Sequence, residues 1–169
     1  MRKFVFIDES IRDSYVMAAV IVPIQRLGDY RRAMSTLRTK GSMAFHMGNE
    51  KKQKRQAAFA LLSSLEYTQV IWVTSLEKYQ NQARRECLTL IISQLQSQDH
   101  WKAILDRTTR QASDQKFLLE LRQSFGLNLE FSHSSRYEDS GLWGADIAAW
   151  FGKSPVKNAS LSTQPPVAT

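Results

Sequence analysis

Two neighbouring stretches, KFVFIDES at residues 3–10 and YVMAAVIVP at residues 15–23, decide the fold. Each is a short run of aromatic and β-branched residues, and each is bounded by charge or by proline, which is typical of strands. The link IRDS between them is short, so we expect the two strands to form an antiparallel hairpin. Pro23 is expected to end the second strand, because proline cannot donate a hydrogen bond to the next strand.

Helical and strand patterns alternate after this hairpin. Apolar residues recur at helical spacing in four segments, which are 27–39, about 50–65, about 80–99 and the region from Phe117 to Phe125. Further strands are predicted over 69–75, 102–106 and 127–131, and a last helix over 142–151. Asn49 is expected to cap the second helix and Gly126 to follow the end of the fourth. The pattern predicts an α/β fold, with an antiparallel hairpin and then parallel strands in one mixed sheet flanked by helices.

The length of 169 residues and the 43% of hydrophobic residues suit one domain with a full core, which we expect to span residues 1–153. Residues 154–169 are polar, hold three of the four prolines and show no periodicity, so a disordered tail is expected there. The single cysteine, Cys87, falls on the apolar side of its predicted helix and is expected to be a core residue. A lone thiol and the lack of a recognisable signal peptide or membrane span favour a cytoplasmic protein.

The net charge of +7 and the pI of about 9.7 favour a polyanionic partner, and nucleic acid is the first candidate. Lys51, Lys52, Lys54 and Arg55 form one basic cluster at the start of a predicted helix. Of these, Lys51, Lys52 and Arg55 are candidates to bind phosphate groups. The alternative is that the cluster is simply a solvated helix face.

Two acids stand at the ends of predicted strands. Asp8 shares one face of its strand with Phe4 and Phe6, while Glu9 takes the opposite face. Asp106 lies in the same way at the end of its strand, on the face of Ile104. In open α/β sheets, ligands bind beyond the carboxyl ends of the strands. The alternative for either acid is that a strand merely ends at a charged residue.

Asp146 is the third acid, and it lies within the apolar helix GLWGADIAAW. Leu142, Trp143, Ala149 and Trp150 are three or four residues away and share its face. A carboxylate on a buried helix face must be balanced by a cation, a metal or hydrogen-bond donors. A structural salt bridge would satisfy Asp146 equally well.

Converging carboxylates are the ligands that Mg²⁺ and Mn²⁺ prefer, and two such ions can promote phosphodiester hydrolysis. Asp8, Asp106 and Asp146 are therefore the predicted metal ligands. His46, which precedes the basic cluster, is a candidate to activate water or contact phosphate, and a buried structural histidine is the alternative.

Three segments together resemble the DUF3800 family, which has an RNase H-like fold. They are FIDES with the following YVMAAVIVP, then AFHMGNEKKQKR, and finally FSHSSRYEDSGLWGADIAAW. The resemblance covers about residues 3 to 153 and implies a nuclease or another enzyme that processes nucleic acid. It matches Asp8 and Glu9 to the family's acidic pair and Asp146 to its late aspartate, and it matches His46, Glu50 and Glu138 to polar positions.

The chain departs from this family at several positions. Ile11 follows DES, where many members have glycine, and the strand at 69–75 ends in Thr74 and Ser75, where a ribonuclease H proper would have an acid. Asp106 falls where members often have an acid, but it belongs to a later strand than Thr74 and Ser75. It therefore does not replace the acid that is missing from the strand at 69–75.

The leading hypothesis is a metal-dependent nuclease that acts on RNA or DNA. Glu9, Glu50 and Glu138 would then be additional ligands or partners of the ligands. The alternative is a non-catalytic module that binds nucleic acid or protein on a degenerate RNase H-like scaffold, and hydrolysis of small phosphoesters is a third option. The nuclease hypothesis requires at least three carboxylates within reach of a metal, whereas Asp8 and Asp146 in separate regions would favour the binding module.

Overall fold

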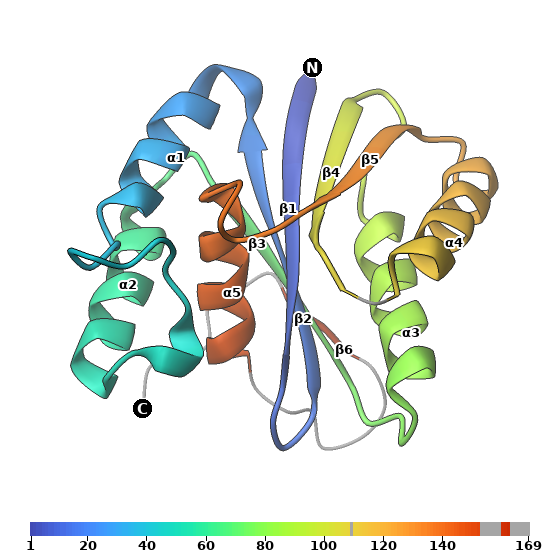
Figure 1. Cartoon of the computed structure of the whole chain (residues 1–169). Coiled ribbons are helices and arrows are strands. Elements are labelled where there is room, and N and C mark those ends of the chain that lie inside the picture. Colours follow the sequence, from blue (N-terminus) through green and yellow to red (C-terminus); the bar gives the residue numbers. More distant parts are fainter. Residues whose placement is uncertain (109, 153–159, 163–169) are drawn as a thin grey trace.

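A computed structural model describes residues 1–108, 110–152 and 160–162 (Figure 1). In this part of the chain, one mixed sheet has the strand order β5-β4-β1-β2-β3-β6. The strands are β1 (Arg2–Ile11), β2 (Tyr15–Pro23), β3 (Gln69–Ser75), β4 (His100–Asp106), β5 (Asn128–Ser134) and β6 (Ser160–Ser162). The helices are α1 (Leu27–Ser35), α2 (Lys52–Ser64), α3 (Gln80–Ser93), α4 (Gln111–Ser124) and α5 (Gly141–Phe151), with short 3-10 turns η1 (Ile24–Arg26) and η2 (Met47–Asn49).

The sheet has an antiparallel half and a parallel half, and both meet at β1. β1 pairs with β2 in antiparallel register from Lys3 opposite Pro23 to Ile11 opposite Tyr15, which confirms the predicted hairpin. On its other side β1 pairs in parallel with β4, and β4 pairs in parallel with β5. β3 is antiparallel to β2, so β1, β3, β4 and β5 all run in one direction. The carboxyl ends of β1 and β4 therefore lie together.

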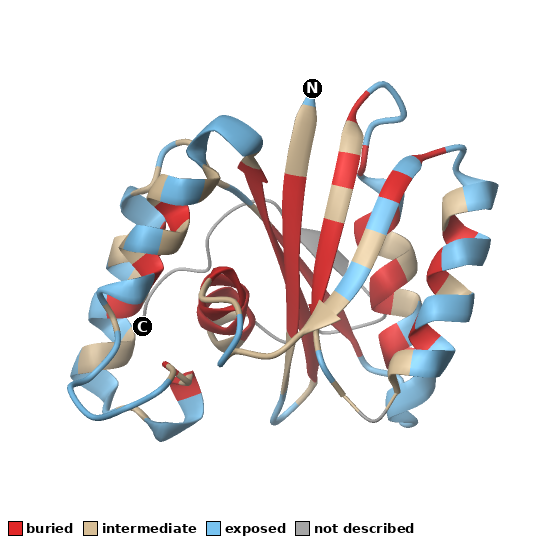
Figure 2. Cartoon of the chain, turned by 45° about the horizontal axis from the view of Figure 1, so that its top comes forward, coloured by how far each residue is buried: buried red, intermediate tan, exposed pale blue. Residues whose placement is uncertain are grey.

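Helices cover both faces of the sheet. α1, α2 and α5 lie on one face, with α5 between the other two and the sheet, and α3 and α4 lie on the opposite face (Figure 1). Alternation along β1 divides the core accordingly, since Phe4 and Phe6 pack toward α5 whereas Val5 and Ile7 pack toward α3 and α4. Figure 2 shows buried positions on the sheet-facing sides of the helices and along almost all of α5. Cys87 belongs to the core under α3, and burial raises the pKa of its thiol to about 12.

α5 packs unusually close to its neighbours because two of its positions lack a side chain. A Cβ atom on Gly141 would collide with the ring of Phe6, and one on Gly144 would collide with the hydroxyl of Tyr30. Hydrogen bonds fix the same contact, from Tyr30 Oη to the carbonyl of Gly141 (2.8 Å) and from Trp72 Nε1 to the carbonyl of Ala148 (2.8 Å). This close packing sets the position of Asp146 relative to β1.

Some predicted boundaries are wrong. The first helix ends at Ser35 rather than at residue 39, because the chain turns at Thr36. Asn49 does not cap the second helix: it lies in η2, its backbone N–H bonds to His46, and α2 begins later, after Lys51. Gly126 does follow α4 with a φ of 60°, as predicted.

The predicted disordered tail, 154–169, lies mostly outside the described residues. Its described part, Ser160–Ser162, forms β6 against Trp72–Thr74 of β3. Among the described residues, no helix is long and apolar enough to cross a membrane.

Candidate active site

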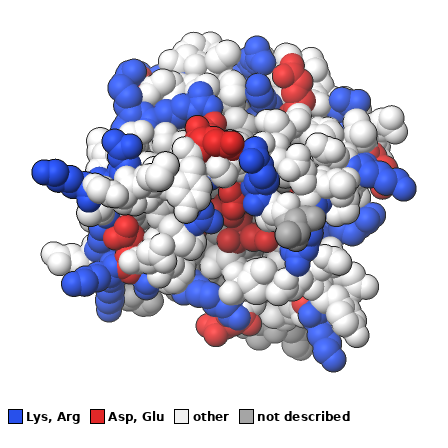
Figure 3. Space-filling model, viewed as in Figure 1, with Lys and Arg blue, Asp and Glu red and all other residues white. Residues whose placement is uncertain are grey.

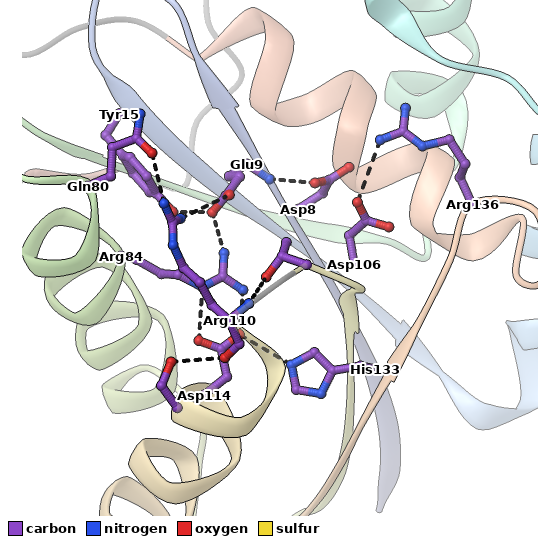
Figure 4. A network of polar contacts seen from close by, with 12 residues as sticks. Asp8, Glu9, Tyr15, Gln80, Arg84, Asp106, Arg110, Asp114, His133 and Arg136 are labelled. Atoms are coloured by element: carbon purple, nitrogen blue, oxygen red, sulfur yellow. Dashed lines mark hydrogen bonds and ion pairs between the residues drawn. The ribbon is translucent and has the colours of Figure 1, made fainter.

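The end of β1 carries two acids on opposite faces of the sheet. Asp8 continues the side of Phe4 and Phe6 and lies toward α5, whereas Glu9 lies toward α3 (Figure 4). This confirms the alternation expected from the sequence. The two acids also have different partners, and we describe the Asp8 side first.

Asp8 is buried and lies in the field of two other carboxylates. Burial, and then the negative charges of Asp146 and Asp106, raise the pKa of the Asp8 carboxyl well above its ordinary value. The backbone N–H of Glu9 donates to Asp8 Oδ1 (2.7 Å) and favours the ionised form, but it does not offset the first effects. Asp8, Asp106 and Asp146, called here the acid cluster, thus come together from β1, β4 and α5.

Among the described residues, Asp106 is the member of the acid cluster that forms an ion pair with an arginine. Arg136, from the segment between β5 and α5, lies with Nη2 3.5 Å from Asp106 Oδ2 (Figure 4). Burial raises the pKa of Asp106, the nearby guanidinium of Arg136 lowers it, and Asp146 raises it further, so that the pKa is above its ordinary value. The guanidinium of Arg136 thus lowers the pKa of Asp8 and Asp106 but does not offset burial and the neighbouring acids.

Hydrogen-bond donors, rather than a cation alone, satisfy Asp146. Its Oδ2 accepts the backbone N–H of Met47 (2.8 Å) and lies 3.0 Å from His46 Nδ1. Both donors belong to the segment that leads into η2, so Asp146 ties this segment to α5. His46 is thus a neighbour of the acid cluster, and it contacts the cluster through the carboxylate of Asp146.

A cavity of about 280 Å³ opens at the carboxyl ends of β1 and β4. Its polar lining residues are Asp8, Glu9, Arg84, Asp106, Thr108 and Arg136. On the face that Figure 3 shows, acidic side chains lie near the middle, and lysines and arginines surround them together with other acidic groups. A phosphate-bearing ligand would meet positive charge at the edge and the acids inside.

On the opposite face, Glu9 is part of a network in which charges are paired (Figure 4). Arg84 of α3 contacts Glu9, and so does the hydroxyl of Tyr15. The guanidinium of Arg84 also binds Asp114 of α4 in bidentate fashion, with Nε 3.0 Å from Oδ1 and Nη2 2.6 Å from Oδ2. Arg110 lies 3.9 Å from Glu9 and adds a second cation.

His133 of β5 completes this network, with Nε2 3.2 Å from Asp114 Oδ2. Burial pushes the pKa of Asp114 upward, but the contacts with His133 and Arg84 outweigh burial and hold the pKa below its ordinary value. The network joins β1, β2, α3, α4 and β5, and its paired charges indicate a structural role.

The other predicted acids, Glu50 and Glu138, have basic partners of their own. Glu50 forms an ion pair with Lys54 in the next turn (3.1 Å). Glu138 is half exposed, pairs with Arg107 (3.1 Å) and accepts the backbone N–H of Ser135 (2.9 Å). Within the described residues, no three histidine, cysteine or acidic side chains are already placed to hold one metal ion.

The predicted phosphate-binding residues differ in whether their side chains already make contacts within the protein. Lys51 and Lys52 are exposed. Arg55 is engaged: its Nε donates to the carbonyl of Met47 (2.9 Å), and its guanidinium lies over the ring of Trp150. Arg55 therefore supports the segment that holds Asp146.

Sequence reasoning missed Arg84, Asp114 and Arg136. A signal was present for the first two, because each lies on the apolar side of its helix, beside Cys87 and Leu88 or beside Phe117 and Leu118. The same argument that singled out Asp146 applies to them. Arg136 lies in a polar turn with no periodicity, and nothing in its local sequence marks it.

Comparisons with known proteins identify the fold. The chain matches no known family model and no curated protein sequence, so the resemblance to DUF3800 stays a prediction. Among solved structures it is similar to RNase HII of Archaeoglobus fulgidus, solved in complex with PCNA, with 17% identity, a TM-score of 0.57 and coverage of 89% of this chain and 71% of that one. It is also similar to ribonuclease H2 of Pyrococcus horikoshii OT3, with 12% identity, a TM-score of 0.61 and coverage of 88% and 70%. The α/β sheet with its flanking helices is therefore an RNase H-like fold.

Proposed function

We propose that this protein is a cytoplasmic, divalent-metal-dependent nuclease that hydrolyses phosphodiester bonds of RNA or DNA. The observation that carries the proposal is the convergence of Asp8, Asp106 and Asp146 from three separate elements: Asp8 and Asp106 line one cavity, and Asp146 lies near enough to raise the pKa of both. Such convergence is costly for folding, because like charges repel in a site of low polarity. Functional sites are where perturbed carboxyl groups of this kind gather.

The donor set suits Mg²⁺ or Mn²⁺. All three side chains offer hard carboxylate oxygens, and within the described residues the one guanidinium paired with them is that of Arg136. Asp8 and Asp106 would hold the ion, and Asp146 would complete the set. A bound ion of this kind supplies charge stabilisation at the phosphoryl oxygens and activates water.

The remaining residues position the acids and the substrate. His46 and the Met47 N–H hold Asp146 in one orientation. Arg136 presents its guanidinium at the edge of the cavity, where it can bind a phosphate oxygen. Glu9, Glu50 and Glu138 each have a basic partner already, so we rank them behind the acid cluster as ligands.

The net charge of +7 supports a nucleic-acid substrate, because counterion release favours its binding to a basic surface. The structural neighbours are ribonucleases, and the resemblance to DUF3800 points in the same direction. These similarities support the class of reaction and leave the choice between RNA and DNA to experiment.

The test is a cleavage assay on labelled single- and double-stranded RNA and DNA with Mn²⁺ or Mg²⁺. We expect metal-dependent cleavage that falls in Asp8→Asn and Asp146→Asn by more than the about 10- to 100-fold loss typical of removing an outer partner of a ligand. Asp13→Asn is the matched control, because Asp13 is an exposed acid in the β1–β2 link and should leave cleavage unchanged. Full activity in Asp146→Asn would refute the assignment.

The second candidate is a non-catalytic nucleic-acid-binding module. It is favoured by the observation that Arg136 already lies against Asp106 and that no metal-ready trio of side chains exists in the described part of the chain. This candidate predicts binding that weakens with added salt and no turnover with any metal. Asp8→Asn would then strengthen binding, because it removes negative charge from the cavity.

A further inference from the structure

A second cavity lies beside the acid cluster on the other side of Arg136. It has a volume of about 300 Å³ and is lined by Ser42, Ala44, His46, Asn49, Arg136 and Tyr137. Arg136 lines this cavity and the one at Asp8 and Asp106. His46 lines it as well and contacts Asp146. The two cavities are therefore adjacent, and a ligand group in the second one would lie next to the acid cluster.

The lining of this second cavity is suited to a flat aromatic ligand that carries hydrogen-bonding groups. Tyr137 lines this cavity and is 67% exposed, so its side chain is accessible to a ligand there. Asn49 is exposed, and its side-chain amide has no hydrogen-bond partner within the described residues, so both its donor and its acceptor are free. Together they offer a stacking surface and a group that can read the edge of a base.

The segment that carries Tyr137 is held firmly on both sides. Trp143 Nε1 donates to the carbonyl of Arg136 (2.8 Å). Asp139 receives two bonds from Arg31 of α1, with Nε at 3.0 Å and Nη2 at 2.5 Å. Glu138 accepts the backbone N–H of Ser135 (2.9 Å). Because the backbone is already ordered, stacking on Tyr137 would cost little additional entropy.

We propose that this cavity binds one unpaired nucleobase, whose neighbouring phosphate lies at Arg136 beside the acid cluster. The base stacks on Tyr137 and its edge meets the amide of Asn49. The inference rests on the proposed nuclease function and narrows its substrate to a strand that is unpaired at this position.

A base within a duplex cannot enter such a site, because its faces are covered by its neighbours and its edge is paired. Sequence-tolerant binding of single strands commonly combines aromatic stacking with a basic track along the backbone. The exposed Lys51 and Lys52, which closely follow Asn49 in the sequence, provide positive charge near this cavity. A small phosphoester without a base would use only Arg136.

Binding is measured in EDTA, so that cleavage plays no part, by fluorescence anisotropy of a labelled single-stranded oligonucleotide about eight nucleotides long. We expect Tyr137→Ala to raise the Kd by about 5- to 150-fold, the range for loss of one stacked base. Tyr137→Phe keeps the ring and should bind as wild type does. Tyr79→Ala is the matched control, because Tyr79 is 64% exposed and lies at the start of α3, outside both cavities.

A second measurement locates the base. Oligonucleotides with a single abasic position, moved along the strand, should show one position whose loss weakens binding to the wild type. That loss should disappear in Tyr137→Ala, because the base and the ring form one interaction.

The outcomes separate the two proposals. If Tyr137→Ala binds as tightly as Tyr79→Ala, or if no oligonucleotide binds, the base site is refuted even where the protein cleaves nucleic acid. If the Tyr137 and abasic effects appear but no metal supports cleavage, the base site stands and the nuclease proposal fails.

Discussion

Asp8 and Glu9 are neighbours on one strand, yet they lie in opposite electrostatic environments. Glu9 contacts Arg84 and the Tyr15 hydroxyl within a network that balances its charge. Asp8 lies on the other face with Asp106 and Asp146, and its pKa is raised by burial and by both of these acids. The side of Glu9, called here the balanced side, connects five elements of the fold. The side of Asp8, called the unbalanced side, brings together acids that oppose folding.

This difference gives a way to separate structural from functional carboxylates. A buried acid whose neighbours are basic side chains contributes to stability, and its loss is expected to lower the free energy of unfolding. A buried acid that has other acids as neighbours opposes stability until a cation binds. The three predictions below test this contrast, and they run from the largest expected effect to the smallest.

Replacing the central cation of the balanced side should have the largest effect. Arg84→Met leaves Glu9 and Asp114 buried without their main partner, and it should lower the free energy of unfolding by about 3–5 kcal/mol. Urea denaturation measures the change. Arg85→Met is the control, because Arg85 is 59% exposed and its loss should change stability by no more than about 0.5 kcal/mol. Equal effects of the two substitutions would contradict the structural role of Arg84.

Metal addition should act only on the unbalanced side. At a free Mn²⁺ concentration ten times its Kd, the folded wild-type protein should gain about 1.4 kcal/mol, seen as a rise in Tm. Asp8→Asn should lose this gain while remaining folded, because the amide keeps the shape of the side chain and removes its charge. A Tm that responds to Mn²⁺ equally in both proteins would place the metal elsewhere.

The ion pairs of the balanced side should make the free energy of unfolding depend on pH. This effect should be smaller than the two above and should appear only in acid solution. Asp114 has a pKa below its ordinary value of 3.8, so its stabilising contribution is complete above that value. The contribution declines as the pH falls further and is lost once the pH passes the lowered pKa of the folded state. The stability difference between wild type and Asp114→Asn, measured by thermal unfolding from pH 7 to pH 2, should therefore stay constant and shrink only at the acid end. A difference that shrinks well above pH 3.8 would contradict the assignment.

The fold could be predicted from the sequence because its strands are marked by composition and its helices by spacing. The hairpin at 3–10 and 15–23 and the strand at 69–75 match the observed elements closely. The segment before α2 could not be predicted, because η2 is held in place by contacts of Met47 with Asp146 and Arg55, which lie far from it in the sequence or on the following helix. The residue types around Asn49 favour it as a helix cap, but these tertiary contacts place Asn49 in η2 and α2 begins only at Lys52.

The site could be predicted only where burial and charge conflict within a short segment. This conflict between charge and an apolar surrounding marks Asp8 and Asp146. It marks Arg84 and Asp114 as well, since each lies on the apolar side of its helix. The partners of these residues could not be predicted, since pairing depends on which helix covers which face. The roles of Glu50 and Glu138 as ligands rested on the resemblance alone, and the structure gives both of them basic partners.

The order of the elements along the chain has a consequence for synthesis. The central strand β1 has only β2 as a partner until β4 emerges, because its second neighbour begins at His100. Asp146 follows later still, on the last helix of the described chain. Since a protein leaves the ribosome from its N-terminus, the acid cluster is assembled only after α5 has been made. A ribosome-bound fragment that stops before α5 would carry Asp8 and Asp106 without Asp146. The acid cluster would therefore be incomplete while the chain is still being made.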